Sequence, residues 1–193
     1  MSRISDIQDI LNQMNESFIL APVATVMQFL QQEDLIKEYA IGGSVAIAIW
    51  SEPFDTDDID IFCDFSPAVA GNLSLLRKRV EEAGLGQMRG MYLNIRGTKV
   101  QLQSVANGPP VELAAFKNAT WIDCEGGIKA RVFELEYALA MKAYANRIED
   151  WLHISIALRS ADIDMPKLEG ILNKFQGKDG LLLWETWKEY YGR

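Results

Sequence analysis

The alternation of apolar and polar residues predicts short strands interspersed with helices, followed by a wholly helical end. Strict alternation indicates a half-buried strand, and apolar residues spaced three and four apart indicate a helix. Residues 72–83, for example, place Leu73, Leu76 and Val80 on one helical face and charged side chains on the other. The predicted helices are 5–15, 22–32, 72–83, 134–146, 148–160, 165–176 and 180–191, and the predicted strands are 37–41, 58–65, 91–95, 98–105, 121–124 and 129–133.

Turn residues mark where these elements are joined or interrupted. Arg96-Gly97 separates two alternating runs and predicts a hairpin, whereas Pro109-Pro110 interrupts the pattern. Residues 45–50 are apolar throughout, so their pattern fits both a buried strand and a buried helical turn. We expect a strand-bearing core with N-terminal helices over residues 1–130, and a helical region packed on it over residues 131–193.

The composition is that of a compact cytoplasmic protein. With 193 residues, 49% hydrophobic and 24% charged, the chain can bury one core with a small helical appendage. It contains no run of about eighteen apolar residues, so we expect no membrane span, and its start lacks the apolar core of a signal peptide. Cys63 and Cys124 stand far apart and in no ligand spacing, which argues against a disulfide framework or a zinc site.

One segment of the chain combines a glycine turn with paired carboxylates. Gly42-Gly43-Ser44 is followed after thirteen residues by a run in which Asp58 and Asp60 alternate with isoleucines. Residues i and i+2 of a strand share a face, and two carboxylates held so close repel unless a cation sits between them. Oxygen ligands of this kind suit Mg²⁺ or Mn²⁺. A glycine turn that enters a helix attracts phosphate through its N–H groups and the helix dipole, so the segment indicates nucleotide chemistry or its remnant.

The acidic run also has a plainer interpretation. Five aspartates lie between residues 55 and 64, and such clusters are commonly solvated loops. An EF-hand is excluded because no glycine or bidentate glutamate follows at the required positions. The strand pattern after a glycine turn favours a metal site over a plain surface loop, and Asp64, further along the same face, is expected to meet solvent.

These two motifs resemble the signature of the nucleotidyltransferase superfamily. Ile41-Gly42-Gly43-Ser44 and Asp58-Ile59-Asp60-Ile61 fit that signature, and Thr56 sits where relatives often carry threonine. Phe54 stands where many relatives have arginine. More narrowly, residues 20–160 resemble the AbiEii-type branch, known chiefly as bacterial toxins paired with antitoxins. The resemblance implies an α/β (α+β) fold, with a small mixed sheet and a C-terminal helical bundle, and makes residues 45–50 a helix.

The third carboxylate of the superfamily has no direct counterpart here. Active members usually take it from a neighbouring strand, where it helps to bind metal and can act as a base. The corresponding strand places Gln101 at the expected position, with Lys99 and Gln103 on the same face. A glutamine can ligate a metal through its carbonyl or hydrogen-bond a nucleotide, but it cannot accept a proton as a base does. Glu112 and Asp123 are the alternative carboxylates.

The helical region resembles the superfamily less closely than the two motifs do. Lys142, Arg147 and Asp150 match positions that face the nucleotide in relatives, whereas Glu149 and His153 depart from the pattern. Lys142 lies on an apolar stripe, so it must reach solvent or meet an anionic partner. His153 alone indicates a packed or surface histidine rather than a ligand. The resemblance thus implies Asp58, Asp60 and Gln101 as catalytic residues, Asp58 and Asp60 as metal ligands, and Gly42, Gly43, Ser44, Lys99, Lys142, Arg147 and Asp150 as nucleotide-binding residues.

Three functions follow from these observations. The first is transfer of a nucleotidyl group from a nucleoside triphosphate with Mg²⁺ (or Mn²⁺) to an RNA (such as tRNA) or protein hydroxyl, in a toxin restrained by a cognate antitoxin. The second is a catalytically degenerate module that binds a nucleotide or a partner, and the third an aminoglycoside-type antibiotic transferase. The net charge of −8 disfavours unspecific nucleic-acid binding, so an RNA substrate requires a local basic patch or a basic partner.

Overall fold

The computed structural model describes residues 20–70 and 72–191, and the helix expected over residues 5–15 lies outside them. The chain divides into two compact units, each assembled from three segments. We call them the sheet unit, Met1–Ile41, Asp57–Ala106 and Thr120–Val132, and the helical unit, Gly42–Thr56, Asn107–Ala119 and Phe133–Arg193.

All described strands belong to the sheet unit and form one seven-stranded sheet in the order β3-β4-β5-β2-β1-β7-β6. The β1/β7 and β2/β5 pairs are parallel and the other pairs antiparallel, which confirms the expected mixed α/β class. The strands are β1 (Ile36–Ile41), β2 (Ile59–Phe65), β3 (Gln87–Arg89), β4 (Tyr92–Ile95), β5 (Thr98–Ser104), β6 (Thr120–Asp123) and β7 (Lys129–Val132).

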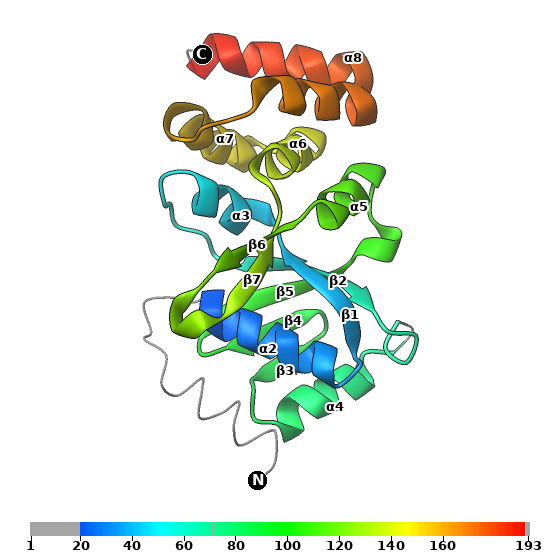
Figure 1. Ribbon diagram of the computed structural model, residues 1–193. Helices are drawn as coiled ribbons and strands as arrows, with labels where there is room; N and C mark the ends of the chain where they lie inside the picture. Colours follow the sequence, from blue (N-terminus) through cyan, green and yellow to red (C-terminus); the bar gives the residue numbers. More distant parts are fainter. Residues whose placement is uncertain (1–19, 71, 192–193) are drawn as a thin grey trace. The chain divides into compact units, whose positions relative to one another are not determined.

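Two helices pack on this sheet. Helix α2 (Leu20–Gln32) packs against β1 and β7, and α4 (Ser74–Glu82) packs against β3 (Figure 1). As the pattern predicts, Leu76 and Val80 of α4 are buried while its charged residues are exposed. Short 3₁₀ turns, η1 (Val105–Asn107) and η2 (Glu125–Gly127), follow β5 and β6. Helix α4 therefore covers the sheet with one apolar face, whereas α2 is buried at nearly every position from Ala21 to Leu30.

The predicted hairpin is confirmed between β4 and β5. Arg96 and Gly97 form its two-residue turn, both with positive φ (51° and 89°), as a type I′ turn requires. Strand β3, which pairs with β4, is absent from the prediction. It spans only Gln87–Arg89, too short for an alternating pattern to stand out.

The helical unit contains five described α-helices. They are α3 (Gly43–Trp50), α5 (Pro110–Lys117), α6 (Leu135–Ala145), α7 (Ile148–Ser160) and α8 (Met165–Tyr191). Helix α6 packs against the other four. The chain is non-helical at Gly177 (φ 62°, ψ −143°), so α8 comprises the two helices predicted on either side of this residue. Trp184 and Trp187 in the second half of α8 are buried and contribute to the core.

The helical unit also corrects one prediction and confirms another. Pro109-Pro110 does not end the regular structure but opens α5, because Pro110 occupies the first helical turn, where a missing N–H costs nothing. Residues 45–50 are helical, as the family resemblance implied and their apolar pattern could not decide. Among the described residues, no helix combines the length and apolar character needed to cross a membrane.

Candidate functional site

Asp58 and Asp60 lie at the start of β2 in the sheet unit. Ile59 and Ile61 point into the core with 2% and 0% exposure, while Asp60 is half-buried on the opposite face. Asp58, the residue before the strand, forms an ion pair with Lys99 of β5, with 3.3 Å between Oδ2 and Nζ. The expected need for a counter-charge is thus met for Asp58 by a lysine of the neighbouring strand.

Strand β5 presents its polar face to the same carboxylates. Val100 and Leu102 are buried, and Lys99, Gln101 and Gln103 alternate with them on the other face, as predicted. In the parallel β2/β5 register Asp60 lies opposite Gln101. The side-chain amide that contacts Asp60 is that of Gln103, whose Nε2 donates to Oδ1 at 2.7 Å.

Neither alternative carboxylate joins this pair within the sheet unit. Asp123 lies on the edge strand β6, three strands from β2, and is ion-paired with Lys129. Glu112 belongs to the helical unit, where it is buried on α5 beside Gly108. Among the described residues, no group of three or more His, Cys, Asp or Glu side chains is placed to hold a metal ion.

The donor set of β2 nevertheless fits a magnesium ion that arrives with a nucleotide. Mg²⁺ keeps several waters and is commonly bound by one or two carboxylates together with substrate phosphates, so two aspartates suffice. Lys99 contacts Oδ2 of Asp58, so movement of this lysine would free the second carboxylate oxygen for a cation. The Gln103 amide carries a donor and an acceptor, and turning it over presents its carbonyl oxygen instead of its N–H.

The glycine turn opens α3 in the helical unit. Gly42 is the N-cap, and Gly43 adopts φ 58°, a left-handed conformation that favours glycine. The first intrahelical hydrogen bond runs from the Ala46 N–H to the Gly42 carbonyl. The N–H groups before Ala46 therefore have no partner inside the helix, the arrangement that attracts anions at helix N-termini.

Ser44, Lys142, Arg147 and Asp150 form one polar cluster in the helical unit. Lys142 Nζ donates to Asp150 Oδ1 at 2.6 Å and to Ser44 Oγ at 3.0 Å. Arg147 binds the same carboxylate with two hydrogen bonds of 2.9 and 3.0 Å. Asp150 is fully buried and Lys142 nearly so. The sequence required Lys142 either to reach solvent or to meet an anionic partner. In the structure it meets an anionic partner, Asp150.

The hydrogen bonds within this cluster determine whether the carboxyl group of Asp150 is ionised. Burial by itself raises the pKa of Asp150, but hydrogen bonds from Arg147 and Lys142 outweigh burial, so the pKa lies below its ordinary value. Asp150 is therefore ionised at neutral pH and compensates the buried ammonium of Lys142.

His153 extends this cluster toward Phe54. Burial, and then the charge of Lys142, lower the pKa of His153, so its ring is neutral at pH 7. The Ser44 hydroxyl lies 3.1 Å from Nδ1. Because Ser44 Oγ already accepts from Lys142, its own proton can be donated to that nitrogen. Phe54 stacks on the imidazole with 4.4 Å between ring centroids, a contact that no sequence pattern indicates.

The predicted site residues thus fall into two groups, one in each unit. Asp58, Asp60, Lys99 and Gln101 lie together on one face of the sheet, while Gly42, Gly43, Ser44, Lys142, Arg147 and Asp150 lie in the helical unit. Sequence reasoning missed the role of Gln103 as the hydrogen-bond partner of Asp60. The shared polar face of β5 was the available signal, but the register alone places Gln101 opposite Asp60, so the choice of Gln103 depends on how the side chains cross between the strands.

Comparison with known proteins identifies the fold. No protein-family model matches the sequence, and no curated protein matches it. The crystal structure of an antigenic nucleotidyltransferase-like protein from Paracoccidioides brasiliensis aligns with a TM-score of 0.59 and 15% identity, over 92% of this chain and 90% of that chain. The solution structure of the antibiotic-resistance factor ANT(2'')-Ia aligns with a TM-score of 0.50 and 15% identity, over 86% and 96%. The chain therefore has a nucleotidyltransferase-like fold.

Proposed function

We propose that this protein is a metal-dependent nucleotidyltransferase that binds a nucleoside triphosphate and transfers its nucleotidyl group to a hydroxyl acceptor. The observation that carries the proposal is the pair Asp58 and Asp60, which meet the polar side chains of β5 on one face of β2. The nucleotidyltransferase-like fold supports it.

Each side chain on this face has a role in the proposal. Asp58 and Asp60 hold the divalent cation, and Gln103 orients Asp60 through its hydrogen bond. When bound, Mg²⁺ or Mn²⁺ neutralises charge on the transferring phosphates. Lys99, once it leaves Asp58, is positioned to pair with a phosphate oxygen. Because glutamines cannot accept a proton, we expect turnover to be slow.

For the helical unit we propose that the first turn of α3 binds phosphate. Gly43 and Ser44 supply N–H groups at the positive end of the helix dipole. Lys142, Arg147 and Asp150 support this turn, since Lys142 hydrogen-bonds the Ser44 hydroxyl and Asp150 holds both cations. Lys142 and Arg147 therefore act as positioning residues here, besides any contact they make with a nucleotide.

Nucleotide binding is expected to require Mg²⁺ or Mn²⁺. Calorimetry with each of the four ribonucleoside triphosphates measures this, because the triphosphate and two carboxylates repel each other without a cation. We expect Mg²⁺ to strengthen binding to the wild type by at least about tenfold, which corresponds to about 1.4 kcal/mol of binding free energy. In Asp58→Ala/Asp60→Ala this dependence on Mg²⁺ should disappear.

The matched control is Asp64→Ala, which removes a carboxylate from the same face of β2. Asp64 forms an ion pair of 3.9 Å with Lys37 and lies further along the strand. This variant should bind nucleotide as the wild type does. An equal Mg²⁺ effect in the double variant would remove the metal site from the proposal.

A second candidate function is a binding module without chemistry. Lys99 pairs with Asp58 and Gln103 with Asp60, and among the described residues no third carboxylate joins them in a metal-binding group. This arrangement also fits a site that has lost its reaction. Incubation with α-labelled nucleotides separates the two functions, since a binding module retains nucleotide but labels no RNA, protein or aminoglycoside acceptor.

A toxin role is expected from the resemblance to the AbiEii-type branch. Inducible expression in bacteria should slow growth several-fold, and Asp58→Ala should restore it, because growth arrest would depend on nucleotidyl transfer. The measurement is optical density after induction, with soluble protein quantified in both cultures. Wild-type growth at high soluble expression would argue against a toxin while leaving the enzyme proposal intact.

A further inference from the structure

His153 is the one histidine of the chain, and it lies beside the polar cluster of the helical unit. Imidazole is the side chain whose ordinary pKa lies close to neutrality, so it changes charge between about pH 5 and 8. The ring of His153 stacks on that of Phe54, with 4.4 Å between the ring centroids and 12° between the ring planes. Both residues depart from the superfamily pattern, so the resemblance assigns no role to this stacked pair.

Hydrogen bonds to Ser44 determine where the protons lie in this part of the helical unit. Lys142 Nζ donates to Ser44 Oγ at 3.0 Å, because an ammonium group can only donate. The same oxygen lies 3.1 Å from His153 Nδ1, so the Ser44 hydroxyl donates its own proton to that nitrogen. The neutral ring then carries its proton on Nε2. While His153 is neutral, Ser44 therefore has no proton left to donate to a ligand.

Protonation of His153 reverses the hydrogen bond to Ser44. Both nitrogens of an imidazolium ring are donors, so Nδ1 then donates to Ser44 Oγ and the hydroxyl proton is released. Phe54 holds the ring in place in both charge states, since an aromatic face also attracts a cation stacked on it. Ser44 belongs to the first turn of α3, where the proposed function places phosphate. A protonated His153 thus turns the Ser44 hydroxyl into a donor for a phosphate oxygen.

The charges around His153 determine when its ring gains a proton. The charged groups that act on it are Lys142 of α6, Arg147 before α7, and Glu149 and Asp150 of α7. Helix α3 carries no charged residue, and α8 contributes none of these groups. Burial, and then the charge of Lys142, lower the pKa of His153. A phosphate at the first turn of α3 acts in the opposite direction, because a nearby anion favours the charged form of a base.

We propose that His153 is a positioning residue of the phosphate-binding turn of α3 and gains a proton from solvent when the phosphates of a nucleotide bind there. It acts through Ser44, from which it accepts a hydrogen bond while neutral and to which it donates one once protonated. The proton returns to solvent when the phosphates leave. The inference rests on the proposed binding of phosphate at this turn and adds a dependence on pH. Because coupling between two ligands is reciprocal, phosphate binds more tightly as pH falls.

Proton NMR of the untagged protein tests the proposal, because a single histidine gives a single set of imidazole signals. Their titration is followed with and without millimolar tripolyphosphate, in the absence of metal, in the wild type and in Asp58→Ala/Asp60→Ala. The double variant lacks the β2 carboxylates, so phosphate binding to it needs no cation. We expect tripolyphosphate to raise the pKa of His153 by about one unit or more in at least one of the two proteins, the effect of a nearby opposite charge. Sodium chloride at equal ionic strength should raise it less.

His153→Asn separates the proposed role from a purely structural one. The amide oxygen of Asn can accept the hydrogen bond from Ser44, but the side chain cannot gain a proton. Calorimetry should show that lowering the pH from about 8 to about 6 strengthens tripolyphosphate binding to the wild type several-fold more than to His153→Asn, since protonation of His153 accompanies binding only in the wild type. Circular dichroism should show the same folded structure in both proteins.

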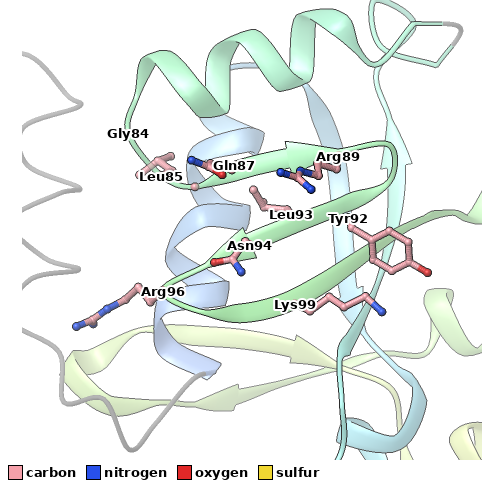
Figure 2. A pocket seen from close by; sticks show the side chains of 10 residues that line it. Gly84, Leu85, Gln87, Arg89, Tyr92, Leu93, Asn94, Arg96 and Lys99 are labelled. Atoms are coloured by element: carbon pink, nitrogen blue, oxygen red, sulfur yellow. The ribbon is translucent and has the colours of Figure 1, made fainter.

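The matched control is Arg89→Ala. Arg89 is a cation that lines the 920 Å³ cavity on strands β3, β4 and β5 of the sheet unit, where tripolyphosphate can also bind (Figure 2). Its charge is not among those that act on His153, so this variant should leave the response of His153 to tripolyphosphate unchanged. The proposal is overturned if tripolyphosphate leaves the titration of His153 unchanged in both proteins, or if His153→Asn keeps the pH dependence of the wild type. Because neither metal nor nucleotide is present, both outcomes are distinguishable from failure of the transfer reaction.

Discussion

Replacing Asp60 with Asn is expected to lower nucleotidyl transfer by more than about 100-fold. Groups that only orient a metal ligand typically cost 10- to 100-fold when removed, and loss of a ligand itself should exceed this. Asn retains the size of the side chain and can still hydrogen-bond Gln103, so the change removes charge with little disturbance. The measurement is transfer of label from α-labelled nucleotides to total RNA or to purified protein.

Variants of Gln103 provide a comparison with Asp60→Asn, because Gln103 contacts the proposed metal ligand and not the metal. Gln103→Ala removes the 2.7 Å hydrogen bond to Asp60 and should lower activity about 10- to 100-fold, less than Asp60→Asn. Gln103→Glu places a third carboxylate beside the pair, so Mg²⁺ should raise its melting temperature more than that of the wild type. If Asp60→Asn is as active as the wild type, the carboxylates of β2 are not the reactive centre.

The local part of the fold was predictable because neighbouring residues determine it. The Arg96-Gly97 turn, the alternation in β2 and the glycine between the two halves of α8 each depend on conformational preferences of a few consecutive residues. The shared polar face of β5 likewise follows from the period of two in a strand. The placement of Asp60 opposite the core therefore required no tertiary information.

The contacts of the candidate site were not predictable in the same way. The choice of Gln103 over Gln101 as partner of Asp60 depends on the side chains crossing from β5 to β2, which no local pattern encodes. The stacking of Phe54 on His153 joins residues distant in the chain. Helix α5 was missed because a proline pair reads as an interruption until its position in the first helical turn is known.

The polar cluster of the helical unit is expected to dominate stability. Asp150→Asn removes the carboxylate that compensates the buried Lys142, and breaking a buried pair in this way costs about 3–5 kcal/mol. At about 2–4 °C per kcal/mol for a chain of this size, the melting temperature should fall by about 10 °C. Thermal unfolding followed by circular dichroism measures the change, and Lys178→Ala, at an exposed position of α8, should stay within about 0.5 kcal/mol of the wild type.

The pH dependence of the melting temperature tests whether the charge of Asp150 is the cause of this stabilisation. The pKa of Asp150 is lowered in the folded protein, so its stabilising contribution is complete above its ordinary value of 3.8 and is lost as pH falls below it. The difference between wild type and Asp150→Asn should therefore be constant near neutrality and shrink below that pH. An unchanged melting temperature for Asp150→Asn at pH 7 would contradict a compensating role for this carboxylate.

The double variant Asp150→Asn/Lys142→Met separates structure from nucleotide binding. Replacing both members of a buried pair by uncharged side chains of similar size is often nearly neutral, so this variant should recover most of the stability that Asp150→Asn loses. If it recovers stability and still binds nucleotide as the wild type does, binding needs neither the ammonium of Lys142 nor its hydrogen bond to Ser44, and the pair serves stability alone. If stability returns but nucleotide affinity does not, the ammonium of Lys142 is needed for binding, either by contact with a phosphate or through Ser44.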